Sequence, residues 1–174
     1  MFANEISNCL NLKRKGVSKA IASFCTANKA CIEAILCHYK GRKQPVLIEA
    51  TSNQVNQFGG YTGMKPVDYK KMVYEIADRV DFDKSFIMLG GDHLGPLPWK
   101  GKNESEAMNN AKELVREFVL AGYEKIHLDT SIKLKSDEGH LTDKIIAKRG
   151  VELYKTAIKA WHENLKINKD AIKP

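Results

Sequence analysis

Short apolar runs alternate along this chain with longer segments in which apolar residues recur every three or four positions. The short runs are typical of buried strands, and the longer pattern is typical of amphipathic helices. The pattern predicts strands at 20–25, 46–50, 86–89 and 126–129. It predicts helices at about 3–15, 28–41, 66–80, 103–122 and 142–165.

Several residues mark where the helices should begin and end. Asn28 is a suitable N-cap for the second helix, and Asn103 followed by Glu106 resembles a capping box. Pro66 suits the first position of the third helix. Gly41 and Gly122 are placed to end helices in the left-handed conformation that glycine adopts easily.

The order of these elements is one helix followed by four strand–helix units, which predicts a parallel sheet with right-handed crossovers. A closed (β/α)8 TIM barrel needs eight such units and about 250 residues. The 174 residues therefore form either a compact four-stranded α/β domain or the N-terminal half of a barrel. We favour the half-barrel, as a single domain over 1–174 with a frayed tail at 166–174.

Acidic or imidazole side chains stand at the ends of three of the predicted strands. Glu49 ends one strand, Asp92 and His93 follow the next, and His127 and Asp129 belong to the last. In (β/α) barrels the functional residues lie at the carboxyl ends of the strands. Because strand side chains alternate between faces, Glu49, Asp92, His127 and Asp129 should point toward the barrel axis.

These four residues are candidate catalytic groups, and Asp92, His93 and His127 are candidate ligands for a divalent metal such as zinc or magnesium. Structural roles are the alternatives. Asp92 and His93 could form a polar turn, and His127 and Asp129 could form an internal hydrogen-bonded pair. Glu49 could form a buried salt bridge with an inward lysine or arginine, since an unpaired buried carboxylate is costly.

The segment 51–64 is long, polar and rich in glycine. Loops of this length in compact domains are usually functional or mobile. Two roles remain open for its amide side chains, which could bind sugar hydroxyls or could order their own loop. The candidates for substrate binding are Asn53, Gln54, Asn56 and Gln57.

The net charge of +7 comes from lysines spread along the whole chain, with only a small cluster at 13–15. Nucleic-acid binding is not favoured, because it requires a basic patch. Attraction of an anionic substrate, such as a sugar phosphate, explains the positive charge equally well. No apolar run approaches the roughly 20 residues of a membrane helix, and the first residues lack a signal-peptide pattern, so we expect a cytoplasmic protein with no membrane contact.

The positions of the cysteines also favour a cytoplasmic protein. The four cysteines lie within the first 37 residues and form no CxxC pair. A zinc site built from them is therefore not indicated. Their apolar neighbours predict reduced, buried thiols of a cytosolic protein.

Three motifs resemble one known family, the non-catalytic Z accessory subunits of class II D-tagatose-1,6-bisphosphate aldolase. The motifs are Ile48 to Met64, Leu89 to Pro96 and Lys125 to Ser131, and the resemblance extends over about 8–165. It implies a TIM barrel that supports a separate catalytic Y subunit without catalysing the reaction itself. The complex would cleave tagatose 1,6-bisphosphate to dihydroxyacetone phosphate and glyceraldehyde 3-phosphate in galactitol, N-acetylgalactosamine or tagatose breakdown.

An older name of the family, tagatose 6-phosphate kinase, has no support in the motifs, because no GxxxxGK[ST] phosphate loop is present. The chain also lacks the later strand–helix units of the family, so it resembles an N-terminal fragment or a truncated gene product. We expect it to be marginally stable alone, or else to associate with itself or with a partner. The alternatives are a metal-dependent aldolase or epimerase that acts alone on a keto-sugar or its phosphate, and an inactive remnant.

Overall fold

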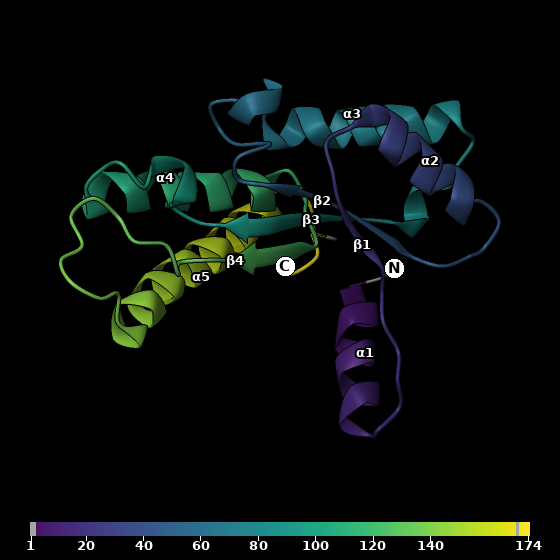
Figure 1. Ribbon diagram of the computed structural model, residues 1–174. Helices are drawn as coiled ribbons and strands as arrows, with labels where there is room; N and C mark the ends of the chain where they lie inside the picture. The colour runs from purple at the N-terminus through teal and green to yellow at the C-terminus, as the bar shows by residue number, and fades with distance from the viewer. Residues whose placement is uncertain (1–2, 170) are drawn as a thin grey trace.

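The computed structural model describes residues 3–169 and 171–174 as a four-stranded parallel sheet with five α-helices (Figure 1). The strands are β1 (Ser23–Cys25), β2 (Val46–Thr51), β3 (Ile87–Leu94) and β4 (Lys125–Leu128). The helices are α1 (Ala3–Arg14), α2 (Lys29–Tyr39), α3 (Pro66–Arg79), α4 (Glu104–Leu120) and α5 (Asp143–Leu165). Short 3-10 helices occur at Gly60–Thr62, Lys84–Phe86 and Leu97–Trp99.

The strands lie in sequence order, β1-β2-β3-β4, and each neighbouring pair is parallel. A helix follows each strand and returns the chain to the next one, as in one half of a (β/α)8 barrel. The predicted half-barrel of parallel strands is confirmed.

Helices α2 to α5 cover one face of the sheet, and α1 projects from the opposite side (Figure 1). The main apolar core lies under the covering helices. From the strands it receives Val46, Ile48, Ile87 and Leu89, with Ile126 and Leu128 packed at its edge. All six alternate along their strands with the residues predicted to point toward the barrel axis, so strand alternation places them on this face.

The helix boundaries follow local chemistry. The Asn28 side chain accepts hydrogen bonds from the amides of Ala30 and Cys31, and Asn103 accepts one from Glu106. The capping box expected at Asn103 is incomplete, because the Glu106 carboxylate pairs with Lys102 instead.

Gly41 and Gly122 have φ values of 78° and 82°, as expected of glycines that end helices. The tail after α5 contains no further helix or strand at 166–169 and 171–174. The Trp161 indole nevertheless donates a hydrogen bond of 3.0 Å to the Ala171 carbonyl, which holds that part of the tail against α5.

Two strand predictions were wrong in extent. The first strand covers only Ser23–Cys25, because the apolar residues before it pair with no neighbouring strand. The third continues to Leu94, so Asp92 and His93 belong to the strand and do not form a turn after it.

The prediction of buried thiols was also wrong. Cys25, Cys31 and Cys37 are exposed and Cys9 is partly exposed, although all four are free. The cysteines of α2 lie on the outer side of the helix, while Ile32 and Leu36 are the residues that it buries.

The second face of the sheet, which we call the inner face, carries its own side chains. Leu47 and Met88 are buried there, outside the main core. Helix α1 makes few contacts with the rest of the chain and, where it meets this face, borders an open cavity of about 590 Å³. The cavity is lined by Ile6, Cys9, Leu10, Ile21, Ser23, Cys25, Leu47, Glu49, Asp92 and Lys125.

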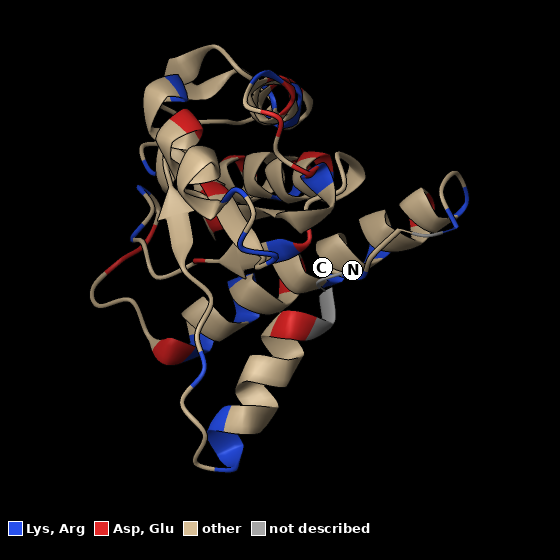
Figure 2. Cartoon of the chain, turned by 90° about the vertical axis from the view of Figure 1, so that its right-hand side faces the viewer, with Lys and Arg blue, Asp and Glu red and all other residues tan. Residues whose placement is uncertain are grey.

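No helix in the described part of the chain is long and apolar enough to cross a membrane. Basic residues are scattered over helices and loops, and the cluster at 13–15 lies at the far end of α1 (Figure 2).

Candidate functional site

One layer of the inner face is built around a glycine. The register aligns Cys25 with Glu49, Glu49 with Gly90 and Gly90 with Lys125, so these residues form a row across the four strands. A Cβ atom at Gly90 would lie 2.4 Å from Glu49 Oε1 and 2.8 Å from its Cγ. The missing side chain thus leaves the space through which Glu49 reaches Lys125.

Glu49 is a fully paired buried carboxylate. Its side chain is only 3% exposed, and its Oε1 lies 2.5 Å from Lys125 Nζ. The Ser23 hydroxyl donates a hydrogen bond to its other oxygen. The structure therefore brings Glu49 into an ion pair with an inward lysine, the arrangement named above as the alternative to catalysis.

Asp92 lies one step nearer the carboxyl ends of the strands. Its Oδ1 is 2.8 Å from His127 Nδ1 and 3.7 Å from Lys125 Nζ. Partial burial alone raises the pKa of Asp92, but the hydrogen bond with His127 and the charge of Lys125 outweigh it. The pKa is therefore lowered, and the carboxylate is charged at neutral pH.

An irregularity in β3 aims the next residue at the same place. The pairing of β3 with β4 shifts register between Gly91 and Leu94, and His93 has a left-handed φ of 49°. A bulge of this kind redirects a side chain that strict alternation would send to the opposite face. As a result the rings of His93 and His127 lie side by side, with centroids 4.5 Å apart.

Asp129 holds His93 in this position. Its Oδ2 is 3.0 Å from His93 Nδ1, while its Oδ1 accepts hydrogen bonds from the Ser131 amide and hydroxyl at 2.9 and 2.6 Å. Partial burial raises the pKa of Asp129, but these hydrogen bonds outweigh that effect and lower it to about 2. The backbone of Asp129 packs closely against Gly95. Only glycine allows this contact, because a Cβ atom at position 95 would lie 1.7 Å from the Asp129 carbonyl oxygen.

Cys25 also borders the cavity, but it is not an activated thiol. Although the residue as a whole is exposed, partial desolvation of its thiol and the nearby Asp92 carboxylate raise its pKa to about 11. A neutral thiol is a poor nucleophile, so the structure gives no support to a catalytic role for Cys25.

The amide side chains of the segment 51–64 are largely engaged within it. Asn56 donates to the Ser52 carbonyl and accepts from the amides of Phe58 and Gly60. Gln54 accepts a hydrogen bond from the Thr51 amide. These bonds order the loop itself, which is the second of the two roles considered for its amides.

The remaining two amides differ in their surroundings. Gln57 donates to the Asn110 carbonyl on α4, and its Oε1 is buried without a partner. Asn53 is exposed, and only its backbone carbonyl is engaged, by the Tyr61 amide. Among the four candidates for sugar binding, Asn53 is thus the most accessible.

Comparison with known proteins identifies the family. Residues 6–172 match the family model described as D-tagatose-1,6-bisphosphate aldolase subunit GatZ/KbaZ-like. The chain belongs to the GatZ/KbaZ-like family. The match extends over all four strands and their helices, and the resemblance seen in the three sequence motifs is confirmed.

A solved structure supports the same fold. It is the crystal structure of "a probable tagatose 6 phosphate kinase from Sinorhizobium meliloti 1021", with 46% sequence identity and a TM-score of 0.79. The superposition covers 82% of this chain and 37% of that one. The chain of the GatZ/KbaZ-like family described here therefore spans little more than a third of that solved relative.

The structure brings Asp92, His93, His127 and Asp129 together, and it places Glu49 one layer deeper. Lys125 and Gly90, which connect the two layers, were not among the site residues predicted from the sequence. Their signal was present in the strand pattern, because both positions fall on the inner face by alternation. The register that aligns them with Glu49 depends on tertiary pairing.

Proposed function

We propose that this chain is an accessory subunit of class II D-tagatose-1,6-bisphosphate aldolase, non-catalytic itself and required for full activity of a catalytic Y subunit. The observation that carries the proposal is the family match over residues 6–172. The complex would act in galactitol, N-acetylgalactosamine or tagatose breakdown in the cytoplasm.

The pairing of the inner-face carboxylates supports a stabilising role. Glu49 is bound by Lys125 and Ser23, Asp92 by His127, and Asp129 by His93 and Ser131. A general acid or base must exchange its proton with a substrate. Carboxylates that are each committed to a neighbouring cation or donor suit a rigid scaffold better.

Co-expression with a class II tagatose-bisphosphate aldolase catalytic subunit tests this function. We expect the two chains to co-purify, and we expect release of dihydroxyacetone phosphate from tagatose 1,6-bisphosphate to fall when this chain is omitted. An aldolase that neither binds the chain nor changes in activity or lifetime with it would refute the proposal. An inactive remnant would give that negative result.

The inner face is also a candidate surface for self-association. The outer edges of β1 and β4 pair with no further strand in the described residues, and the cavity beside them is partly apolar. Two copies could cover each other's inner faces, or the catalytic subunit could do so. Sedimentation of the chain with and without the aldolase separates the two cases.

A second candidate function is a metal-dependent aldolase or epimerase that acts alone on a keto-sugar or its phosphate. The observation that favours it is the convergence of Asp92, His93 and His127. Turnover of a keto-sugar phosphate by the purified chain with added divalent metal, lost in Asp92→Ala, would support it. Absence of turnover by the wild-type chain with metal present would refute this second function, and the accessory role would be the one that stands.

A further inference from the structure

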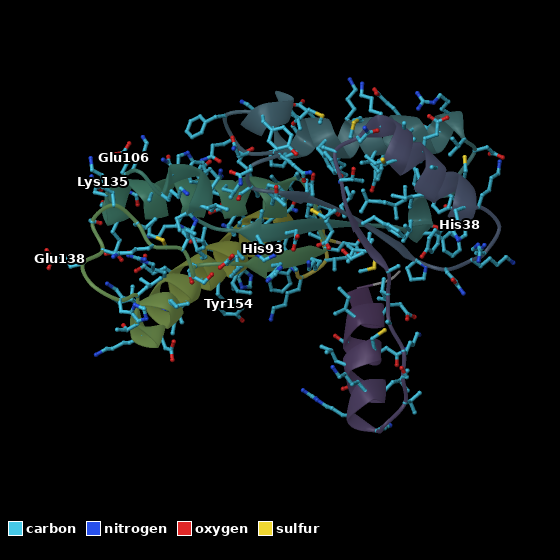
Figure 3. All side chains as sticks on the ribbon, viewed as in Figure 1. His38, His93, Glu106, Lys135, Glu138 and Tyr154 are labelled. Atoms are coloured by element: carbon cyan, nitrogen blue, oxygen red, sulfur yellow. The ribbon has the colours of Figure 1, made fainter. Side chains whose placement is uncertain are left out.

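We propose that His93, His127 and Asp92 form a binding site for one divalent transition-metal ion, with Asp129 as the residue that orients His93. The site lies at the carboxyl ends of β3 and β4, and Figure 3 shows His93 near the arrowhead end of the sheet. It deepens the second candidate function but does not depend on the accessory role, because a scaffold subunit can also hold a metal.

The spacing of the donor atoms is the first argument. One ligand atom from each of Asp92, His93 and His127 can be chosen so that all lie within 4.8 Å of one another. Asp92 Oδ1 is 2.8 Å from His127 Nδ1 and 4.0 Å from His93 Nε2. Ligands at about 2.1 Å from a tetrahedral ion lie roughly 3.4 Å apart, so small side-chain rotations bring the three into place.

The second argument is the orientation of His93. Its Nδ1 is held by Asp129, which leaves Nε2 facing the Asp92 carboxylate. A histidine ligand usually donates its other ring N–H to a carboxylate, which fixes the tautomer and the ring plane. Ser131 in turn holds Asp129 by two hydrogen bonds, so the orienting group is itself fixed.

The third argument is access. The side chains of His93 and His127 are 53% and 44% exposed, and that of Asp92 is 20% exposed. An ion can therefore enter from solvent, and three protein ligands leave a position for water or for an oxygen of a sugar. Two imidazoles and one carboxylate favour zinc, cobalt or manganese over calcium.

Metal titration of the full chain tests the site. We expect saturable binding of one Zn²⁺ or Co²⁺ per chain by calorimetry, and a visible Co²⁺ spectrum that indicates nitrogen ligation. His93→Asn and His127→Asn should each weaken binding at least tenfold. Asparagine suits position 93 because it tolerates the left-handed backbone of His93. Asp129→Asn should weaken binding about tenfold through loss of the orienting carboxylate.

The matched control is His38→Asn. His38 is an exposed histidine on α2, at the opposite end of the strands from His93 (Figure 3), and its loss should leave the metal affinity unchanged. Circular dichroism of each variant shows whether its fold is intact, and the wild-type Co²⁺ spectrum tests nitrogen ligation without any variant. No saturable binding by the wild type, or equal weakening by His38→Asn, would overturn the site. Neither result would bear on co-purification with an aldolase.

Discussion

At the scale of single residues, Gly90 and Lys125 determine the chemistry of the inner face. Gly90 has no side chain, so the Glu49 carboxylate and the Lys125 ammonium meet across β3. Lys125 also lies 3.7 Å from Asp92, so one cation stands between two carboxylates. The deeper carboxylate is buried, and its charge is tolerable only because the lysine is there.

Gly90→Ala should destabilise the protein by about 2 kcal/mol, because its methyl group would displace Glu49 from Lys125. Urea unfolding monitored by circular dichroism measures the change. Gly101→Ala is the matched control, since a Cβ there meets nothing within 4 Å, and it should change stability by less than about 0.5 kcal/mol. Equal effects of the two substitutions would show that the space at Gly90 is not needed.

Lys125→Met should cost about 3 kcal/mol, because it leaves the Glu49 carboxylate buried without its cation. The double variant Glu49→Gln/Lys125→Met removes both charges and should recover most of that loss. Unfolding free energies of the wild type, the two single variants and the double variant complete the cycle. A double variant as unstable as Lys125→Met would contradict the ion pair as the cause.

At the scale of elements, a buried arginine fixes the connection between β4 and α5. Arg149 on α5 is 1% exposed and donates to Asp137 in the connecting loop at 2.9 Å. It also donates to Glu104, the first residue of α4, at 3.1 Å. The loop between β4 and α5 is thus tied at Asp137 to α5 and, through Arg149, to the start of α4.

The Asp137–Arg149 pair predicts a pH dependence of stability. The Arg149 hydrogen bond lowers the pKa of Asp137 in the folded protein. The stabilisation that the charged Asp137 gives to the folded state is therefore complete above the ordinary aspartate pKa of about 3.9, and it is lost as the pH falls through the lower native pKa. Asp137→Asn should therefore cost about 3 kcal/mol at neutral pH and progressively less below about pH 3.9.

Thermal and urea unfolding of the wild type and Asp137→Asn between neutral and acidic pH measures this difference. The control is Glu138→Gln, whose exposed side chain points into solvent in Figure 3. It should have little effect at any pH. If the difference in unfolding free energy between the wild type and Asp137→Asn stayed constant with pH, the charge of Asp137 would be unimportant for stability.

At the scale of the whole molecule, the two faces of the sheet differ. Helices α2 to α5 close one face over a continuous apolar core, whereas α1 alone stands on the side of the inner face, projects away from it and makes few contacts. The open cavity of about 590 Å³ lies on that side, and within the described structure the outer edges of β1 and β4 pair with no further strand. Such edges and apolar surfaces favour association.

The polypeptide 1–174 on its own should therefore be marginally stable or self-associated. Its melting temperature should rise with protein concentration, because association stabilises the folded state by mass action. Scanning calorimetry at several concentrations, with sedimentation velocity at each, provides the measurement. A sharp, concentration-independent melt of a dilute monomer would count against this expectation.

The sequence alone determined the order of the elements, the parallel half-barrel and the family, because apolar periodicity and long motifs are local properties of the chain. It also identified the inward direction of Glu49, Asp92 and His127, since alternation within a strand is local too. The tertiary structure decided which charges meet. Strand register placed Lys125 opposite Gly90, and the β3 bulge turned His93 toward His127. Register and bulges arise from pairing between distant segments, so no local pattern specifies them.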